Sequence, residues 1–333
     1  MHFLDKVHPF VNYAVFGSLM GTLLVIFLIR WLYPNNSKAK AHLFILPLVI
    51  PYLTYALAMI FSFNTRCTIH GLPTVTGVLG SMSMELCRIS TWVGKYLTPI
   101  FLVSAGIAVC KVVASMVTLR KYRDQFGYAT PTEYGELLGI VDGLSEKLNI
   151  KAPQVIVTPF AFGQAFTTGF RQPQIVISRG VLEVADAEEL EAIIAHELVH
   201  VQRMDSLTNW LSVLLRDVIF FTPVSYWTFK QYINEKELTV DMQTVRLTGK
   251  PLAYAEALIK VWRLSPHSWW YKLAVDNWSP NPSLVKEQGI LERRIQRIVD
   301  GPLDNPESIS GPPIVWTMIS VVVVTVSGLF FIC

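Results

Sequence analysis

Five consecutive residues, His196 to His200, carry the strongest chemical pattern in this sequence. They read His-Glu-Leu-Val-His, so two histidines lie four positions apart and a glutamate directly follows the first. Residues four apart share one face of a helix, and both imidazoles can therefore bind a single metal ion. The glutamate, Glu197, can then polarise a water molecule on that ion. This arrangement is typical of metal-dependent peptide hydrolysis.

The residues around the motif favour a helix that would hold it. Asp186 and Glu189 have the types and spacing of an N-cap and its capping-box partner, and good helix formers follow as far as His200. One face of this predicted helix is apolar and carries Leu190, Ile193, Ile194 and Val201. The histidines lie at the edge of that face, which predicts a position along a cleft floor. The competing interpretation is a core helix with two hydrogen-bonded histidines.

A catalytic zinc needs a third protein ligand besides the two histidines. The four cysteines lack the spacing of a zinc knuckle, so the ligand must be a histidine or a carboxylate. Glu237 and Asp241 lie four apart at the start of a predicted helix that runs to about Leu247. We expect one carboxylate to bind the metal and the other to accept a hydrogen bond from a ligand imidazole. Glu235 is a competing ligand, and a solvated acidic helix face is the alternative for the whole segment.

The composition indicates a membrane protein. Of the 333 residues, 52% are hydrophobic and only 16% are charged, and the mean hydropathy is +0.40. These values are too apolar for an ordinary soluble domain. The formal net charge is only +3. We therefore expect the lipid bilayer as a partner, and no nucleic acid.

Four apolar stretches are long enough to cross a bilayer, at about 10–32, 43–63, 96–119 and 314–333. Basic residues follow the first and third stretches, and the positive-inside rule places that side in the cytoplasm. The loop 64–95 then lies outside, where Cys67 and Cys87 can form a disulfide; two free thiols are the alternative. The prediction is a multi-pass protein of the cell membrane.

The polar region 120–313 is large enough for a cytoplasmic domain with its own core. A helix is predicted over 132–148, and short β-branched strands over 154–157 and 174–178. Residues 164–170 are predicted to connect these strands as a strand or turn. We expect the strand 174–178 to form a sheet edge that pairs with an extended substrate. The predicted substrate-binding residues are Gln164, Ala165, Phe166, Ile175 and Val176.

The segment 207–229 is strongly apolar but carries Arg216 and Asp217 at its centre, followed by Pro223. Two adjacent charges are costly in a lipid-exposed span. We therefore predict a hydrophobic helix that lies against the membrane face or the other spans and is broken near Pro223. A fifth span is the alternative, but it would place Glu237 across the membrane from the histidines.

Several motifs together resemble the membrane metallopeptidases of the penicillin-sensing receptor family. They are His196 to His200, then Arg203 and Asp205, then Phe221-Thr-Pro-Val224, and finally Glu237-Leu-Thr-Val-Asp241. Members of that family are integral-membrane zinc proteases that cleave a transcriptional repressor, or themselves, when an outer sensor binds its ligand. The segments Gln164–Gly169 and Leu247–Pro251 are equally similar to a sister group, the HtpX-type and CAAX-prenyl endopeptidases.

The resemblance implies one zinc ion on His196, His200 and Glu237, with Glu197 as general base. It also implies an α+β membrane protein with four transmembrane helices and a mainly helical zincin domain that carries a small β-sheet. Two departures stand out: the chain ends just after the fourth predicted span, without an outer penicillin-binding sensor, and Gln164 stands where the sister group usually has Asn.

Three functions follow from these residues and their resemblance. The first is a signalling endopeptidase that cuts a repressor or regulator at the cytoplasmic membrane face, in response to its own spans or a sensor partner. The second is a quality-control protease for membrane proteins. The third is a receptor or scaffold with a structural zinc, but such a site needs no base, and Glu197 weighs against it. Arg246 and His267 are the predicted candidates for stabilising the charge that develops on the substrate.

Overall fold

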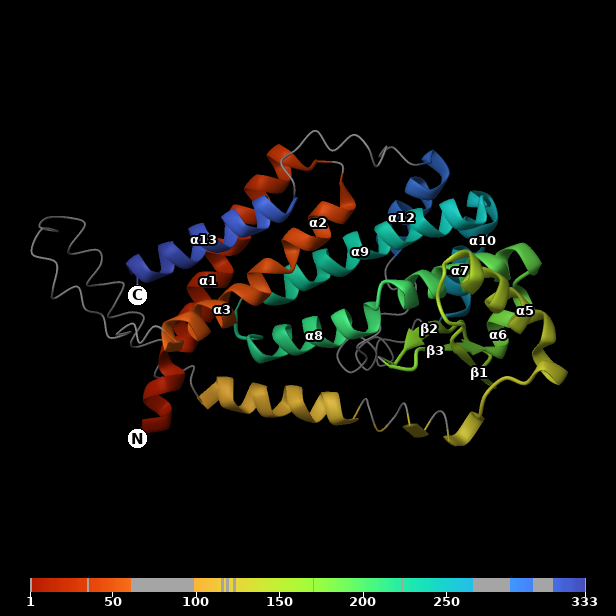
Figure 1. Ribbon diagram of the computed structural model, residues 1–333, viewed down its shortest axis with the longest axis horizontal. Coiled ribbons are helices and arrows are strands. Elements are labelled where there is room, and N and C mark those ends of the chain that lie inside the picture. The colour runs from red at the N-terminus through yellow and green to blue at the C-terminus, as the bar shows by residue number, and fades with distance from the viewer. Residues whose placement is uncertain are drawn as a thin grey trace, which may run out of the picture. The chain divides into compact units, whose positions relative to one another are not determined.

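The structure is a computed structural model that describes residues 2–34, 36–60, 99–114, 117, 120–121, 124–169, 171–222, 224–265, 288–301 and 314–332. The chain folds into two compact units (Figure 1). Unit 1 comprises Met1–Val109, Ser212–Glu235 and Pro306–Cys333, and unit 2 comprises Cys110–Leu211 and Lys236–Asn305. Four features of the sequence lie outside the described residues: the loop 64–95, the Cys67–Cys87 pair, Pro223 and His267.

Unit 1 consists of helices in its described part. Helix α1 spans His2–Leu32, α2 spans Ser37–Phe44, α3 spans Leu46–Ile60, and α13 spans Ile314–Ile332. Two segments, Tyr13–Leu32 and Ser37–Leu57, are long and apolar enough to cross a membrane, whereas the apolar helices Pro99–Ala114 and Ile314–Gly328 are shorter. Two of the four predicted spans therefore reach spanning length within the described residues.

The second span differs from its prediction in both bounds and shape. It begins at Ser37, where the Asn36 side chain accepts a hydrogen bond from the Ala39 N–H at 2.9 Å and caps α2. The chain leaves the helix at Ile45 and re-enters it as α3 at Leu46. Proline is favourable in a first helical turn because its missing N–H is not needed there. Pro47 therefore lies in the first turn of α3 and does not interrupt it, whereas Pro51 lies inside the helix.

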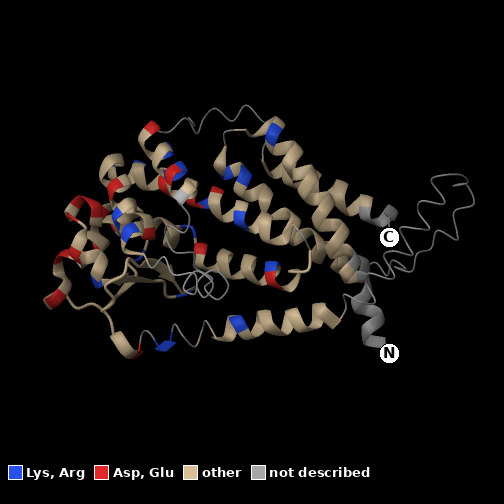
Figure 2. Cartoon of the chain, turned by 180° about the vertical axis from the view of Figure 1, so that it is seen from behind, with Lys and Arg blue, Asp and Glu red and all other residues tan. Residues whose placement is uncertain are grey.

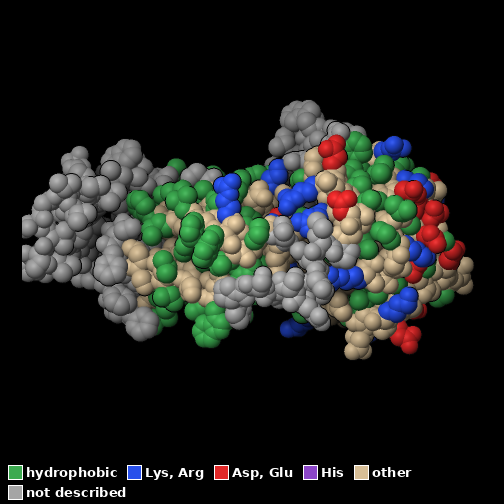
Figure 3. All heavy atoms as spheres, turned by 90° about the horizontal axis from the view of Figure 1, so that it is seen from above, with side chains coloured by type: hydrophobic (Ala, Val, Ile, Leu, Met, Phe, Trp, Pro, Cys, Tyr) green, Lys and Arg blue, Asp and Glu red, His purple; other side chains and the backbone are tan. Residues whose placement is uncertain are grey.

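The surface of unit 1 is apolar, as expected for contact with lipid. Figure 2 shows long stretches of α1, α3 and α13 with few charged residues. Figure 3 shows hydrophobic side chains over much of this unit on the face in view. On α1, Phe27 is 63% exposed and Trp31 is 76% exposed. Large apolar side chains exposed together indicate a surface that another apolar phase covers.

The segment 207–229 forms the end of one helix and the start of another. Helix α8 spans Asp205–Val218 and α9 spans Ser225–Thr248. The break just before Pro223 agrees with the prediction. Arg216 is buried and pairs with its neighbour Asp217 at 2.6 Å, and its guanidinium lies 4.5 Å from the ring centroid of Phe229. This internal pairing allows an apolar helix to carry both charges.

Helix α9 begins well before the predicted start at the acidic segment. The residues of that segment are buried and not solvated: Glu235 is 3% exposed and Lys236 is 1% exposed. The alternative of a solvated acidic face is therefore wrong, because the residues that precede Glu237 on α9 are packed and not open to water.

Unit 2 combines helices with a small sheet. Its elements are α5 (Pro131–Lys147), β1 (Gln154–Thr158), β2 (Ala165–Thr168), β3 (Gln174–Ser178), α6 (Arg179–Val184), α7 (Ala187–Gln202), α10 (Pro251–Leu264) and α12 (Gln288–Asp300). The predicted helix and the two predicted strands are confirmed within a residue or two, and the segment predicted as a strand or turn over 164–170 contains the strand β2. Buried side chains of α5, α7, α10, α12 and the sheet form one continuous core.

The order of the strands corrects one prediction. The sheet order is β1-β3-β2, with β3 parallel to β1 and antiparallel to β2. Strand β3 is therefore central, and the prediction that it forms an edge is wrong. Ile175 and Val176 are 0% and 1% exposed, because this strand carries the core contacts between sheet and helices. Neither residue has an open edge to offer to a substrate.

Helix α7, which carries the histidine motif, begins where the sequence predicts. The Asp186 side chain accepts a hydrogen bond from the Glu189 N–H, and the Glu189 side chain accepts one from the Asp186 N–H, both at 2.9 Å. The short helix before it packs closely on the preceding loop. A Cβ at Gly180 would lie 2.1 Å from the carbonyl oxygen of Ala161, so only glycine fits there.

Candidate metal centre and active site

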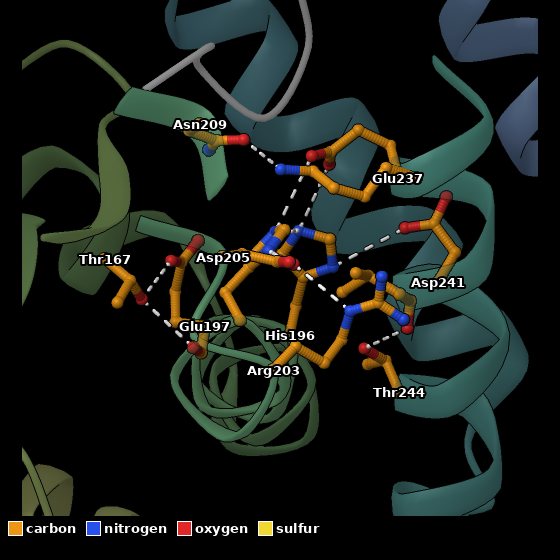
Figure 4. Close-up of polar contacts among 12 residues, drawn as sticks. Thr167, His196, Glu197, Arg203, Asp205, Asn209, Glu237, Asp241 and Thr244 are labelled. Atoms are coloured by element: carbon orange, nitrogen blue, oxygen red, sulfur yellow. Dashed lines mark hydrogen bonds and ion pairs between the residues drawn. The ribbon is translucent and has the colours of Figure 1, made fainter. Parts of the chain in front are cut away.

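Three side chains from α7 and α9 bring their ligand atoms together (Figure 4). The Nε2 atoms of His196 and His200 are 3.1 Å apart. Glu237 places one carboxylate oxygen 3.5 Å from His196 Nε2 and the other 3.6 Å from His200 Nε2. The Glu237 carboxylate thus lies directly opposite the two imidazoles within unit 2.

This triangle of donor atoms fits a zinc ion. Ligands about 2.0–2.1 Å from a tetrahedral zinc lie about 3.3 Å from one another, close to the observed separations of 3.1, 3.5 and 3.6 Å. Two imidazole nitrogens as close as 3.1 Å also require a proton or a cation between them. His196, His200 and Glu237 would hold the metal, and the donor set of two imidazoles and a carboxylate is one that catalytic zinc uses.

The second nitrogen of His200 is fixed by an aspartate at the start of α8. Nδ1 of His200 lies 2.7 Å from Oδ2 of Asp205, and the same oxygen accepts a hydrogen bond from Arg203 Nε at 3.2 Å. Burial alone would raise the pKa of Asp205, but the hydrogen bond from His200 and the charge of Lys236 lower it to about 2. An ionised Asp205 keeps the proton of His200 on Nδ1 and leaves Nε2 available to a metal.

The second nitrogen of His196 is fixed through a tyrosine. Tyr254, on α10, lies with its hydroxyl 2.7 Å from His196 Nδ1 and donates to Asp241 Oδ1 at 2.5 Å. Because the hydroxyl has one proton, it must accept from His196 Nδ1–H, which again leaves Nε2 as the ligand atom. The sequence predicted a direct bond between Asp241 and an imidazole, but Asp241 Oδ1 is 3.5 Å from Nδ1.

Arg294 on α12 completes this buried network. Its Nε and Nη2 donate to the two carboxylate oxygens of Asp241 at 2.7 and 2.6 Å. Its Nη2 also lies 3.7 Å from Glu237. Burial alone would raise the pKa of Glu237, but the charges of His200 and Arg294 and a hydrogen bond with His196 hold it well below its usual value. The Glu237 carboxylate is therefore anionic at neutral pH.

Glu197 is held by β2 of the sheet. The Thr167 hydroxyl lies 2.7 Å from the Glu197 carboxylate and 3.0 Å from its backbone carbonyl. Glu197 is buried and lines the same pocket as His196, His200 and Glu237. A carboxylate in this place can take a proton from a water molecule and later release it.

The pocket above these residues has three walls within unit 2. Strand β2 contributes Ala165, Phe166 and Thr167, α7 contributes the histidines and Glu197, and the beginning of α8 together with α9 contributes Asp205, Ser206, Asn209 and Glu237. Behind this third wall, the ammonium of the buried Lys236 on α9 donates a hydrogen bond to Oδ1 of Asn209 on α8.

The structure thus brings His196, Glu197, His200, Glu237 and Asp241 together, and Ala165 and Phe166 border the same pocket. Gln164 stands one residue before the lining part of β2, while Ile175 and Val176 are buried in the central strand. Arg246 is exposed and does not line the pocket.

Sequence reasoning missed Thr167, Tyr254, Arg294, Asn209 and Lys236. These residues stand outside the histidine motif and on several elements, and no local spacing links them to it. Two of them had a neighbour that could have pointed to the site: Thr167 directly follows the predicted substrate-binding residue Phe166, and Lys236 directly precedes Glu237 but was interpreted as a solvated charge.

Comparison with known proteins gives a consistent result. A protease HtpX homolog of Acaryochloris marina is 27% identical over 184 residues, which cover 44% of this chain and 62% of the relative. One from Nostoc punctiforme is 28% identical over 223 residues, covering 54% of this chain and 76% of the relative. The alignment with the first relative therefore spans less than two thirds of its length.

The crystal structure of Ste24p of S. mikatae aligns over 89% of this chain and 98% of its own, with 14% identity and a TM-score of 0.31. The family model described as BlaR1 peptidase M56 matches residues 15–298, most of the chain including every residue of the candidate metal centre. The chain therefore belongs to the M56 peptidase family.

Proposed function

We propose that this protein is a membrane zinc endopeptidase that hydrolyses peptide bonds of a protein substrate at the cytoplasmic membrane face. The observation that carries the proposal is the triangle of His196, His200 and Glu237 ligand atoms beside the buried Glu197 carboxylate. A purely structural zinc site would be closed by a fourth protein ligand, whereas these three residues leave one position for water.

The chemistry divides between the metal and the chain. A zinc ion held here would lower the pKa of a bound water and polarise the scissile carbonyl. Glu197 removes the water proton and passes it to the leaving amine. Thr167 holds the Glu197 carboxylate against β2, which keeps the base in one orientation. Tyr254 and Asp205 hold the imidazoles as neutral Nε2 ligands.

The open edge of β2 is the surface on which an extended substrate would pair. The Gln164 carbonyl accepts a hydrogen bond from the Ser178 N–H, so alternate residues from Gln164 direct their backbone groups to β3. Ala165 and Thr167 then direct theirs to the open edge. The Thr167 carbonyl already accepts from the Ser206 hydroxyl at 3.3 Å, so among the described residues of this edge Ala165 is the one that we expect to offer its backbone groups for main-chain pairing.

The biological role that we propose is cleavage of a regulator, such as a repressor, in signalling, because the family model described as BlaR1 peptidase M56 matches and the motifs resemble the penicillin-sensing receptor family. The alternative is quality control of membrane proteins, which the similarity to HtpX homologs favours. Both roles use the same site residues, so the substrate must be identified directly.

Substrate trapping tests the proposal and separates the two roles. We expect Glu197→Gln to keep its zinc and its fold but to lose proteolysis in a membrane or detergent preparation, and to retain bound substrate for identification by mass spectrometry. Glu188→Gln is the matched control, because Glu188 lies on the same helix, is exposed and forms an ion pair with Lys250 away from the pocket. Full turnover by the zinc-loaded Glu197→Gln protein would refute Glu197 as the base, and absence of proteolysis by the zinc-loaded wild type would refute the proposed function.

A further inference from the structure

The start of α8 reaches two different parts of the site through consecutive residues. Asp205 lies 2.7 Å from Nδ1 of the metal-binding His200. The hydroxyl of the next residue, Ser206, donates a hydrogen bond to the backbone carbonyl of Thr167 on β2 at 3.3 Å. Ser206 is 5% exposed and lines the same pocket as Thr167. It therefore connects α8 to the edge strand that borders the metal centre.

A tight turn between α7 and α8 places both of these residues. Met204, which directly precedes Asp205, has a φ of 54°, a left-handed conformation that is unfavourable for a residue with a Cβ. Such a conformation persists where contacts on either side of it fix the chain. Directly after Met204 those contacts are the pairing of Asp205 with His200 and the hydrogen bond from Ser206 to Thr167.

Thr167 joins the Ser206 hydroxyl to the proposed base. The Thr167 hydroxyl donates to the Glu197 carboxylate at 2.7 Å (Figure 4), while the Thr167 carbonyl accepts from Ser206. These bonds form a continuous path from α8 through β2 to the carboxylate on α7. Strand β2 has only four residues, and in the described sheet it pairs with β3 alone. A contact on its outer edge therefore restrains it, and a shift of β2 would move the Thr167 hydroxyl away from Glu197.

We propose that Ser206 is a positioning residue for the general base: its hydroxyl holds β2 at Thr167, and Thr167 in turn holds the Glu197 carboxylate. This inference rests on the proposed function and adds a residue of α8 to the support of the base. Two consecutive residues of α8 then serve the two halves of the chemistry, because Asp205 supports a metal ligand and Ser206 supports Glu197. The distance of 3.3 Å is longer than the usual value of about 2.7–2.8 Å for a hydroxyl donor, which predicts a modest effect.

The first variant is Ser206→Ala, which removes only the hydroxyl. We expect kcat for a peptide substrate to fall about fivefold, with KM, zinc content and thermal stability near those of the wild type, because the lost contact acts on the base. Ser206→Thr keeps a hydroxyl and should restore most of kcat. Thr208→Ala is the matched control: Thr208 is exposed, its hydroxyl donates to the Asp205 carbonyl within α8 at 3.1 Å, and it does not line the pocket.

Double variants test the route through Thr167. If Ser206 acts through the Thr167 hydroxyl, Ser206→Ala should have no further effect on kcat in a Thr167→Val protein, so the two effects should not add. In a zinc-loaded Tyr254→Phe protein, Ser206→Ala should keep its full effect, because Tyr254 contacts His196 from α10. A general loss of packing would lower kcat equally in both backgrounds, and that outcome would contradict the positioning role.

Acetohydroxamic acid provides a readout that does not need turnover. A hydroxamate binds zinc through two oxygens, and its remaining proton can be shared with a nearby carboxylate. Its affinity for the zinc-loaded protein, measured by calorimetry, should fall in Ser206→Ala but not in Thr208→Ala, and Thr167→Val should abolish the difference. Absence of proteolysis by the zinc-loaded wild type would refute the proposed function alone. Unchanged kcat in Ser206→Ala would overturn the inference if the wild type is active, and unchanged hydroxamate affinity would overturn it if the wild type is inactive.

Discussion

Replacing Tyr254 with phenylalanine isolates the hydrogen bond that supports His196. The variant keeps the buried ring but removes the hydroxyl, which lies 2.7 Å from His196 Nδ1. Asp241 Oδ1 is 3.5 Å from that nitrogen, too far to replace the lost acceptor without movement. Asp241 itself stays paired, because Arg294 donates to both of its oxygens.

The expected loss of zinc affinity follows from the His196 Nδ1–H group, which the substitution leaves without an acceptor. A buried N–H that loses its acceptor costs about 1–3 kcal/mol, and each 1.4 kcal/mol is tenfold in an equilibrium constant. We expect zinc affinity to fall about 10- to 100-fold, the range known for groups that support a metal ligand. Burial raises the pKa of Tyr254 well above its usual value, so the wild-type hydroxyl keeps its proton in any neutral buffer.

The assay is competition for zinc against a chromogenic chelator, using purified protein in detergent at constant pH. Tyr128→Phe is the matched control, because Tyr128 is exposed and its hydroxyl accepts a hydrogen bond from Gln174, away from the metal centre. If Tyr254→Phe binds zinc within twofold of the wild type, the reasoning that Tyr254 fixes the His196 tautomer is refuted.

Three further predictions concern the base, the metal and the fold. Thr167→Val should lower kcat about tenfold with unchanged zinc content, because the Glu197 carboxylate loses the hydroxyl that orients it; equal kcat values would contradict this. Burial alone would lower the pKa of His200, but Glu237 and Asp205 raise it. Zinc needs the neutral ring, so affinity measured by chelator competition should fall about tenfold per pH unit below that raised pKa and level off above it; a flat profile would exclude such proton competition. Gly180→Ala should destabilise the fold by about 1–3 kcal/mol in thermal unfolding, because the new Cβ meets a backbone oxygen, whereas Gly139→Ala meets nothing within 4 Å.

The sequence alone predicted the parts of the site that depend on local geometry. The histidine spacing, the Asp186 capping box and the pairing of Glu237 with Asp241 all follow from the period of a helix, which relates residues within two turns. The positions of β1 and β3 followed from short β-branched runs between turns, whereas the segment that contains β2 was predicted only as a strand or turn. Apolar length likewise indicated the spans, although the described residues include two of full spanning length instead of four.

The tertiary structure decided which elements meet. Only the packing of α10 on α7 and of α12 on α10 brings Tyr254 and Arg294 to His196 and Asp241, and only the strand order makes β3 central and leaves the edge to β2. The same holds for Thr167 at Glu197 and for Lys236 at Asn209. The local period of a helix or strand determines which residues share one face of that element. Contacts between distant elements depend instead on how all of these faces pack together into one core. No spacing along the chain predicts that packing.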